Sequence, residues 1–552
     1  MSAESVASAL GIKTPNKKNA GKNGDVFARV VTSAQMRRLE ADAAKKLGIP
    51  SLLFMENAAA KTVPHIISML GMRNGGAKNN AVIFCGPGNN GGDGLAVARN
   101  LFASGIEATA VCVGEIRYAG DALVNFEIAK KMRIPIYSFY GNETSASPPA
   151  GGPPAISLLQ AKDFISSSKI VIDAMFGTGL DRPLAGACAE TVGLINGFAE
   201  ATLSLDIPSG VNADTGAVMG RAVKADATVA YGFLKPGLLL YPGAEHAGKI
   251  FTENISIPAN SPAGGRAIRA LKHGEAHRLL PVRPADSHKG SFGRVSVFAG
   301  SRDMPGAASL CCAAAYRAGA GLVEAFVTEG AAQSIRANSP ETIARVLPEY
   351  AGGYCRESLD RVDEKVFTGP GVLLAGPGIG RTGEACDFVA GLVEKSLAPM
   401  VLDADALNLI AGDLSVLRGK NVAITPHPGE MDRLTGIKSE KIAADPIGAA
   451  ADFAEKHGTV VLLKGARSVV ASPSGETYIN TSGCAALAKA GSGDALAGIV
   501  AGLAAQGLDL FEACVLGAFY HGRAGEIAAD GLSIYGVVAR DVIDALPQAM
   551  RL

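Results

Sequence analysis

Short apolar runs that end in glycine-rich turns recur along this chain, and they restrict the folds open to it. In the first half, such runs occupy 81–94, 169–179 and 201–210. Strands of a parallel sheet read as continuous Val, Ile and Leu runs because helices cover both faces of the sheet. The chain also holds 68 Gly and no Trp, which suits an aliphatic sheet core. The pattern therefore predicts an α/β protein built on parallel sheets.

The strand-and-turn pattern restarts with different motifs after a stretch rich in Pro, Gly and Ser at 258–267. The chain of 552 residues is longer than one ordinary domain of ~150 residues, and its halves show no mutual repeat. We therefore expect two domains. The first folded segment, 33–47, is predicted to be a helix with Ser33 as its N-cap. The predicted divisions are a disordered tail at 1–28, an N-terminal domain at 29–258, a linker at 259–270 and a C-terminal domain at 271–552.

Charge and composition exclude several classes of partner. The 52 Lys and Arg balance 52 Asp and Glu, so no net field favours nucleic acid or an anionic membrane. No apolar run reaches the roughly 18 residues of a membrane span, and the first 28 residues lack the apolar core of a secretory signal. The nine Cys form no CxxC pair, which favours reduced thiols. We expect a cytoplasmic, homo-oligomeric protein that acts on small molecules.

The loop at 86–94 carries the first candidate site. It follows an apolar strand and precedes a helix, so its backbone N–H groups converge where an anionic phosphate is favoured. It is not a Walker A loop because no Gly-Lys-Ser/Thr follows. Asn89, Asn90 and Asp93 crowd its tip. Binding of a ligand or cation is one interpretation, and a glycine-rich turn without a ligand is the other.

Two further turns bring polar side chains to the ends of strands. Asp173 ends one strand, and Asp206 and Ser209 follow another. In doubly wound sheets, ligands bind outside the carboxyl ends of the strands, so the three turns are expected to share one site. Asp206 can serve there as an acid or base, or it can simply cap the following turn.

The motifs GPGNNGGDG, VIDAMFGTGL and LSLDIPSGVNADTG resemble those of the YjeF N-terminal domain, the NAD(P)H-hydrate epimerases, over about 30–258. The resemblance implies a Rossmann-like doubly wound domain with Asp206 as its catalytic acid/base. It also implies a potassium ion held by Asn90, Asp173 and Ser209, all of which offer hard oxygen ligands. The implied substrate-binding residues are Asn89, Asn90, Gly91, Gly92, Asp93, Gly177, Thr178, Gly179, Leu180, Asp181, Arg182, Pro183 and Asp206.

One departure from the family concerns a lysine. Some relatives have a Lys in the loop after Gly177–Gly179, whereas this chain has Asp181 and Arg182 there. An arginine guanidinium does not lose its proton in proteins, so Arg182 is a poor proton carrier. A two-residue acid/base mechanism therefore does not transfer directly to this loop.

The C-terminal half contains the segment 490–498, AGSGDALAG, before an apolar helix. Free N–H groups at the start of this helix form an anion hole, and Asp494 lies in the first turn. Its carboxylate can take a proton from a hydroxyl group while the backbone stabilises a transferring phosphoryl group. Alternatively, an acidic residue is simply favourable at a helix N-terminus.

Three other turns accompany this anion hole. Lys464–Ser468 ends a strand and offers cationic and backbone donors for phosphate. His427 lies between two prolines, where a neutral imidazole can contact a ligand or can face solvent. Asp403 and Asp405 can hold Mg²⁺ through water, or they can cap the next helix.

Together these segments resemble the ribokinase-like YjeF C-terminal domain, the NAD(P)H-hydrate dehydratases, over about 275–545. The resemblance implies a ribokinase-like α/β fold in which Ala307, Gly378, His427 and Asp494 contact the substrate, with Asp494 as the catalytic base. It implies binding of ADP or AMP by Lys464, Gly465, Ala466, Arg467, Ser468 and Gly493, with Mg²⁺ accompanying ADP. Relatives usually have Gly where this chain has Ala490, and often Asn where it has Cys484.

The sequence thus predicts a bifunctional repair enzyme for NADHX and NADPHX, the hydrated forms of NADH and NADPH. The resemblance implies epimerisation of the R and S hydrates, and dehydration of the S hydrate with ADP to give AMP and phosphate. The alternative is a ribokinase-like small-molecule kinase fused to a non-catalytic nucleotide-binding module.

Overall fold

The computed structural model describes residues 26–71, 79–142 and 152–551, and these form two compact units. The N-terminal unit is Arg29–Ala267. Of the described residues, the C-terminal unit contains 268–551 together with 26–28. Of the tail predicted at 1–28, residues 1–25 lie outside the described residues. Over the described ranges, no helix combines the length and apolar character needed to cross a membrane.

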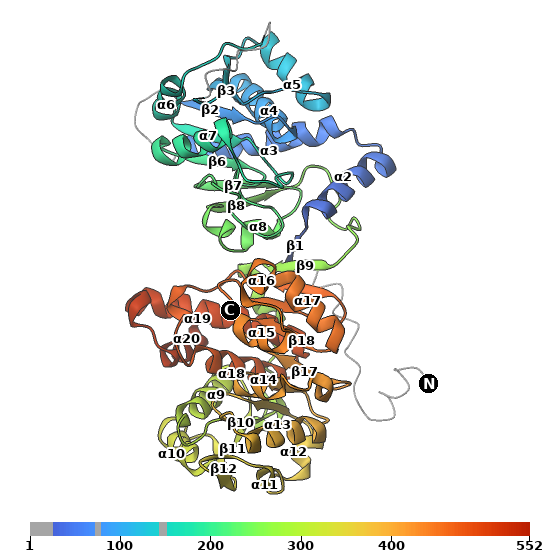
Figure 1. Cartoon of the computed structure of the whole chain (residues 1–552), viewed down its shortest axis with the longest axis vertical. Helices are drawn as coiled ribbons and strands as arrows, with labels where there is room; N and C mark the ends of the chain where they lie inside the picture. The colour runs from blue at the N-terminus through green and yellow to red at the C-terminus, as the bar shows by residue number, and fades with distance from the viewer. Residues whose placement is uncertain (1–25, 72–78, 143–151, 552) are drawn as a thin grey trace. The chain divides into compact units, whose positions relative to one another are not determined.

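The N-terminal unit is a seven-stranded sheet in the order β4-β3-β2-β5-β6-β7-β8, in which every neighbouring pair is parallel. Five of its strands, β2, β3, β6, β7 and β8, are labelled in Figure 1. The order reverses between β2 and β5, which makes a topological switch point where ligands bind in such folds. The strands are β2 (Asn80–Cys85), β3 (Glu107–Val113), β4 (Ile136–Phe139), β5 (Ile170–Ala174), β6 (Thr202–Leu205), β7 (Ala227–Tyr231) and β8 (Lys249–Glu253). The helices are α2 (Ser33–Leu47), α3 (Ser51–Gly71), α4 (Asn89–Ala103), α5 (Gly120–Lys131), α6 (Leu158–Ser167), α7 (Gly186–Phe198) and α8 (Pro236–Leu239).

Successive residues of each strand face opposite sides of this sheet, and both sides are covered by helices. Ile83 packs in the core beneath α2, α3 and α4, whereas Phe84 packs in the core beneath α6 and α7. Burial on both faces explains why the strands read as continuous apolar runs. The predicted Rossmann-like, doubly wound fold is confirmed.

The glycine-rich loop after β2 is compact because backbone groups approach closely there. A Cβ atom placed on Gly86 would lie 1.9 Å from the carbonyl oxygen of Met175, and one on Gly91 would lie 2.0 Å from the carbonyl oxygen of Gly86. No side chain fits in either position. These glycines let α4 begin directly beside the end of β5.

The first helix spans the predicted residues, but its predicted cap is wrong. The N-cap is Thr32, whose hydroxyl accepts from Gln35 N while the Gln35 side chain accepts from Thr32 N. This reciprocal capping box satisfies two free N–H groups at once. Ser33 N and Oγ instead donate to Asp214 Oδ1, at 2.6 and 3.0 Å.

The C-terminal unit has an eleven-stranded sheet in the order β1-β9-β20-β19-β18-β17-β16-β15-β10-β11-β12. Neighbouring strands from β18 through to β12 are parallel, and β18, β19 and β20 pair antiparallel. Its strands are β1 (Phe27–Val30), β9 (Ala267–Leu271), β10 (Arg294–Phe298), β11 (Leu322–Val327), β12 (Ile343–Val346), β15 (Val372–Ala375), β16 (Met400–Leu402), β17 (Val422–Ile424), β18 (Val460–Leu463), β19 (Val469–Ala471) and β20 (Glu476–Ile479), beside a small hairpin of β13 (Glu349–Tyr350) and β14 (Gly353–Tyr354).

The sheet corrects the expected linker and tail. Residues 267–270 would be linker by sequence, yet they belong to β9, and β1 begins within the predicted tail. Both segments are strands because their backbones pair with strands distant in sequence, which local composition does not reveal. The C-terminal unit is therefore discontinuous in sequence.

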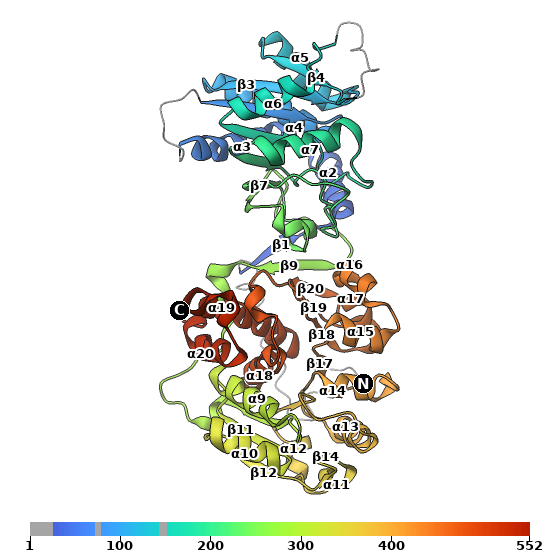
Figure 2. The same ribbon diagram turned by 60° about the vertical axis from the view of Figure 1, so that its left-hand side comes forward.

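Helices cover both faces of this second sheet (Figure 2). One layer contains α9 (Pro305–Arg317), α10 (Glu329–Asn338), α18 (Ser492–Ala505), α19 (Leu510–Gly536) and α20 (Ala539–Ala549). The remaining helices are α11 (Arg356–Leu359), α12 (Glu364–Thr368), α13 (Gly383–Lys395), α14 (Asp405–Ile410), α15 (Pro428–Thr435), α16 (Ser439–Ala444) and α17 (Pro446–His457). Arrangement of helices on both faces of a mainly parallel sheet agrees with the predicted ribokinase-like α/β class.

Helices α9 and α18 pack unusually closely because small residues face each other. A Cβ atom on Gly498 would lie 2.4 Å from Cys311 O, and one on Gly502 would lie 2.5 Å from Ala315 O. This contact fixes α18, whose N-terminus carries Asp494.

We predict that Gly498→Ala lowers the free energy of unfolding by about 1–3 kcal/mol, because the added methyl group overpacks this contact. The matched control is Gly531→Ala in α19, where nothing lies within 4 Å of the added carbon. That change should raise stability by up to about 1 kcal/mol, the usual advantage of Ala over Gly in a helix. Urea unfolding monitored by circular dichroism measures both. Equal stability of Gly498→Ala and the wild type would contradict the close-packing argument.

Candidate functional sites

A cavity of about 470 Å³ lies at the switch point of the N-terminal unit. The predicted residues that line it are Asn89, Asn90, Asp93, Gly177, Thr178, Gly179 and Asp206. Six others, all within the described chain, are absent from its lining: Gly91, Gly92, Leu180, Asp181, Arg182 and Pro183. Gly92 instead makes room for packing, since an added Cβ would lie 2.8 Å from both Ala122 Cβ and Met55 Cε. The three predicted turns therefore do converge on one site.

The amide of Asn90 is the unsatisfied group of this cavity. Asn90 is 8% exposed, and within the described residues neither polar atom of its side chain has a hydrogen-bond partner. A buried polar group without a partner costs about 1–3 kcal/mol. A Cβ atom on Gly177 would lie 3.4 Å from Asn90 Oδ1 and 3.3 Å from Asp206 Oδ2. An unpaired amide and a carboxylate oxygen thus meet where a ligand can satisfy both.

Asp173 is fully buried and saturated with hydrogen bonds. Its Oδ1 accepts from Ser209 Oγ at 2.5 Å and from Met175 N at 3.3 Å. Its Oδ2 accepts from Ser209 N and Ser204 Oγ, both at 2.8 Å. Burial raises the pKa of Asp173, and the hydrogen bonds from Ser209 partly offset that rise.

Two of the three predicted potassium ligands are therefore in direct contact, Asp173 with Ser209, and the third, Asn90, keeps its amide unpaired. Within the described chain, no group of three or more His, Cys, Asp or Glu side chains is placed to hold a metal ion. The three predicted ligands offer an amide, a hydroxyl and one carboxylate oxygen, all of them hard ligands, although Asp173 and Ser209 do not line the cavity that Asn90 lines. They fit a weakly hydrated monovalent cation better than Mg²⁺, which demands more charge.

Asp206 has a lysine partner that sequence reasoning missed. Its backbone is left-handed, with φ 64°. Lys235 Nζ donates to Asp206 Oδ1, and also to Tyr231 O at 2.8 Å. The signal was present in FLKPGLLL at 233–240, where a single charge stands among apolar residues. The loop after Gly179 holds no lysine, and Lys235 reaches Asp206 from another segment.

Two more carboxyl groups, Glu40 and Asp93, line the same cavity. Burial raises the pKa of Asp93 well above its usual range, and the nearby charges of Asp206 and Glu40 raise it further. Burial also raises the pKa of Glu40, with Asp206 contributing. Several carboxyl groups around one ammonium group favour protonated forms, so this cavity can hold a proton as well as accept one.

In the C-terminal unit, α18 begins at the predicted anion hole. Gly491 is its N-cap with φ 83°, and Asp494 lies in the first turn. Burial raises the pKa of Asp494 to about 6, and the nearby Asp403 contributes. A carboxylate with this pKa is ionised near neutral pH and accepts a proton readily.

Lys464 faces two carboxylates and is not a free cation. Its Nζ donates to Asp403 Oδ1 at 2.6 Å and lies 3.7 Å from Glu430 Oε2. Asp403 is 1% exposed, so this pair is largely removed from water. A Cβ atom on Gly493 would lie 3.5 Å from Lys464 Nζ and 3.7 Å from Asp403 Oδ2, so the pair borders the start of α18.

One sequence interpretation was that Asp403 or Asp405 caps the helix that follows. Neither does. The N-cap of α14 is Ala404, with φ 54° and no side-chain cap. Asp405 Oδ2 accepts from Gly380 N at 3.0 Å, and its Oδ1 accepts from Arg381 Nε at 2.7 Å. Both carboxylates therefore join neighbouring loops.

His427 is the N-cap of α15. Its Nδ1 accepts from Gly429 N at 3.0 Å and from Glu430 N at 3.3 Å. Burial lowers the pKa of His427, and a ring whose Nδ1 accepts carries its proton on Nε2. Nε2 lies 3.5 Å from Glu430 Oε1, and the side chain is 51% exposed, so a ligand can reach this N–H beside that carboxylate.

The other predicted C-terminal residues fall in two places. A Cβ atom on Gly378 would lie 2.9 Å from Ala307 Cβ, so these two form one surface. Between β18 and β19, Ser468 Oγ and Gly465 N lie 3.4 Å apart, and Arg467 donates to Thr481 O. Ala466 belongs to the same turn.

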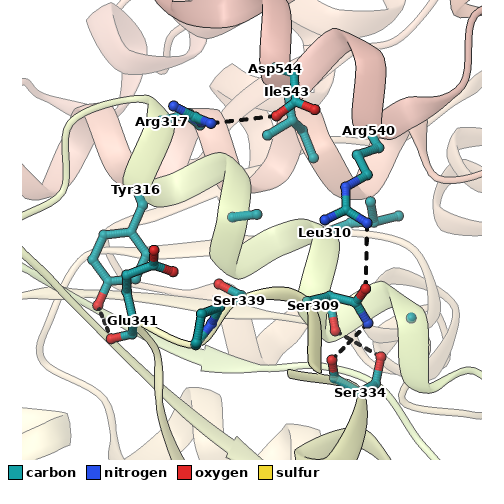
Figure 3. Close-up of a pocket in the computed structure, with 14 residues that line it drawn as sticks. Ser309, Leu310, Tyr316, Arg317, Ser334, Ser339, Glu341, Arg540, Ile543 and Asp544 are labelled. Atoms are coloured by element: carbon teal, nitrogen blue, oxygen red, sulfur yellow. Dashed lines mark hydrogen bonds and ion pairs between the residues drawn. The ribbon is translucent and has the colours of Figure 1, made fainter. Parts of the chain in front are cut away.

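A groove of about 630 Å³ in this unit has none of the predicted site residues in its lining (Figure 3). Arg317 and Asp544 form an ion pair of 3.5 Å across it, and Tyr316 donates to Glu341 O at 2.7 Å. Its lining contains neither Asp494 nor Lys464, both of which the structure describes. Asp494, the Lys464–Asp403 pair and the free N–H groups of the helix start lie instead at the beginning of α18.

Two family models match this chain, one in each half. Residues 295–548 match the family of NAD(P)H-hydrate dehydratases, and residues 51–237 match the family of YjeF-related protein N-termini. A ribokinase-like protein of Enterococcus faecalis is 27% identical, with a TM-score of 0.46, over 51% of this chain and 95% of its own. An ADP/ATP-dependent NAD(P)H-hydrate dehydratase of Bacillus subtilis, crystallised with ATP and Mg²⁺, is 29% identical, with a TM-score of 0.43, over 50% and 96%.

Whole-length relatives settle the family. The bifunctional NAD(P)H-hydrate repair enzyme Nnr of Moorella thermoacetica is 39% identical over 95% of this chain and 96% of its own length. The enzyme of the same name from Thermofilum pendens is 36% identical over the same two shares, 95% and 96%. Both halves of this chain are matched in one relative and in the same order. The chain therefore belongs to the family of bifunctional NAD(P)H-hydrate repair enzymes.

Proposed function

We propose that the N-terminal unit interconverts the R and S epimers of NADHX and NADPHX, and that the C-terminal unit dehydrates the S epimer with ADP. The observation that carries the second activity is Asp494 in the first turn of α18, beside the Lys464–Asp403 pair. The unpaired Asn90 amide beside Asp206 supports the first.

The dehydration follows from the position of Asp494. Its carboxylate takes the proton of the C6 hydroxyl as that oxygen attacks the terminal phosphoryl group of ADP, and AMP leaves. The free N–H groups that begin α18 stabilise the charge on the phosphoryl group in transit. The ring-nitrogen lone pair then expels phosphate from C6, and loss of a proton from C5 restores the dihydronicotinamide.

The nucleotide would be held by the turn at 464–468 and by Gly493. Burial lowers the pKa of Lys464, but Asp403 and Glu430 face the ammonium group and raise the pKa above its usual value, so Lys464 keeps its charge. Mg²⁺ would neutralise phosphate oxygens of ADP, since it usually binds through substrate phosphates and few protein carboxylates. His427 would present its Nε2–H to the substrate.

In the N-terminal unit, Asp206 would be the acid/base at the hydrate carbon. A potassium ion held by Asn90, Asp173 and Ser209 would satisfy the Asn90 oxygen and order the loop at 89–93 against the dinucleotide phosphates. We further expect a homo-oligomer in the cytoplasm, which analytical ultracentrifugation and cell fractionation test.

We predict that Asp494→Asn lowers the dehydration rate by about 10²–10⁴-fold, the usual contribution of a general base. The amide keeps the size of the side chain and cannot accept the hydroxyl proton. Epimerisation by the same chain serves as the internal control and should be unchanged. Near-normal dehydration by this variant would contradict the assignment of Asp494.

The rate of dehydration should also fall at low pH. The pKa of Asp494 is raised to about 6, and the base acts only when ionised. The rate should therefore fall as pH drops through about 6 and level off above it. The residual rate of Asp494→Asn, measured over the same pH range, should show no such inflection. A wild-type rate that stays constant from pH 5 to 8 would argue against a titrating base.

Removal of the Asp173 charge tests the cation site. Asp173→Asn should lower epimerisation by about tenfold or more, a typical effect of altering a metal site, and should abolish any dependence on potassium. The control is Asp163→Asn, which changes a carboxylate of the same unit on α6, away from the cavity. Rates are compared in potassium and in tetramethylammonium. A wild type that epimerises equally fast in both salts would rule out the cation site.

A further inference from the structure

Lys235 lines the epimerase cavity with a buried ammonium group, and no step proposed for the epimerase uses it. Its side chain is 0% exposed, and its Nζ donates to Asp206 Oδ1 and to Tyr231 O. Removing an ion from water costs several kcal/mol unless a partner compensates. The cost of burying Lys235 is therefore offset by its partner, Asp206.

The two oxygens of Asp206 have different surroundings. Oδ1 accepts from Lys235 Nζ and from Tyr231 N, the latter at 3.2 Å. Oδ2 points to the cavity, where it would lie 3.3 Å from a Cβ atom on Gly177. One oxygen is thus held by two donors while the other is presented to a ligand.

The backbone keeps Lys235 in this position. Lys235 is the N-cap of α8, and Pro236 occupies the first turn of that helix. Gly237 N donates to Ala213 O at 2.7 Å, and a Cβ atom on Gly237 would lie 2.2 Å from Asn212 O. The segment is therefore locked against the loop that follows β6, which carries Asp206.

The charge of Lys235 also acts on the other carboxyl groups of the cavity. Burial and neighbouring carboxylates raise the pKa of Asp93 and of Glu40, and in both cases Lys235 opposes the rise. Without the ammonium group of Lys235, Asp206 would lie among these acids and would lack its main compensating charge.

We propose that Lys235 is a positioning residue of the epimerase, which holds Asp206 Oδ1 so that Oδ2 faces the hydroxyl group of the hydrate. Lys235 lines the cavity, but its Nζ is engaged by Asp206 Oδ1 and Tyr231 O. It transfers no proton and acts through Asp206. The inference rests on the proposed function of the N-terminal unit.

The test uses the full-length chain and the purified R epimer. Lys235→Met removes the charge and keeps most of the volume, and Lys169→Met, which alters a surface ion pair with Glu200, is the matched control. We expect Lys235→Met to lower kcat of epimerisation at least about tenfold while KM changes less than about twofold, because substrate contacts remain. Dehydration of the S epimer and the activities of Lys169→Met should equal those of the wild type. Unchanged kcat, or a loss confined to KM, overturns the proposal.

A double variant separates positioning from a structural role. If Lys235 acts only through Asp206, then adding Lys235→Met to Asp206→Asn should cause no further loss of kcat. Removing both charges also avoids an unpaired buried carboxylate, so this pair of variants decides the question even if Lys235→Met alone does not fold. A further drop of about tenfold on the Asp206→Asn background overturns the proposal.

The epimerase activity of the wild type separates a failure of the proposed function from a failure of this inference alone. A wild type that leaves the R epimer unchanged overturns the proposed function and this inference together. An active wild type with an equally active Lys235→Met overturns the inference alone.

Discussion

A carboxylate removed from water must be compensated where it lies, and both sites depend on this constraint. In the N-terminal unit, Lys235 compensates Asp206. In the C-terminal unit, Lys464 compensates Asp403, and Glu430 lies close to the same ammonium group. An unpaired buried charge would destabilise the fold by about 3–5 kcal/mol. Each pair therefore fixes loops from separate strands in one arrangement.

Compensation of these carboxylates leaves other polar groups free for ligands. Asn90 keeps an unpaired amide at the start of α4, and Asp494 keeps a carboxylate at the start of α18. Both helices begin in glycine-rich turns, where backbone N–H groups favour anions. The glycines are required because the backbones touch, as at Gly86 and Met175. Rigid turns beside compensated charges thus give each unit a site prepared for a phosphate-bearing substrate.

Local sequence predicted the parts of this protein that local physics determines. The strands before the glycine turns, the position of α2 and the N-terminal turn of α18 all follow from periodicity and from free N–H groups at a helix start. Contacts distant in sequence were not predictable. Asp206 and Lys235 are distant in sequence and meet only because the sheet forms. Ser33 donates to the distant Asp214, so Thr32 caps the helix instead. Strands β1 and β9 form by pairing with strands far away in the sequence. In each case tertiary pairing overrides the local pattern.

The most direct test of the account begins with the pure R epimer, ADP and the wild-type chain. Reduced-nicotinamide absorbance, the amount of S epimer and the release of AMP and inorganic phosphate are followed together. We expect the S epimer to appear first. Absorbance should then recover, with AMP and phosphate each released in an amount equal to the dihydronicotinamide formed. A stable phosphorylated product without recovery of absorbance, as a small-molecule kinase would leave, would contradict it.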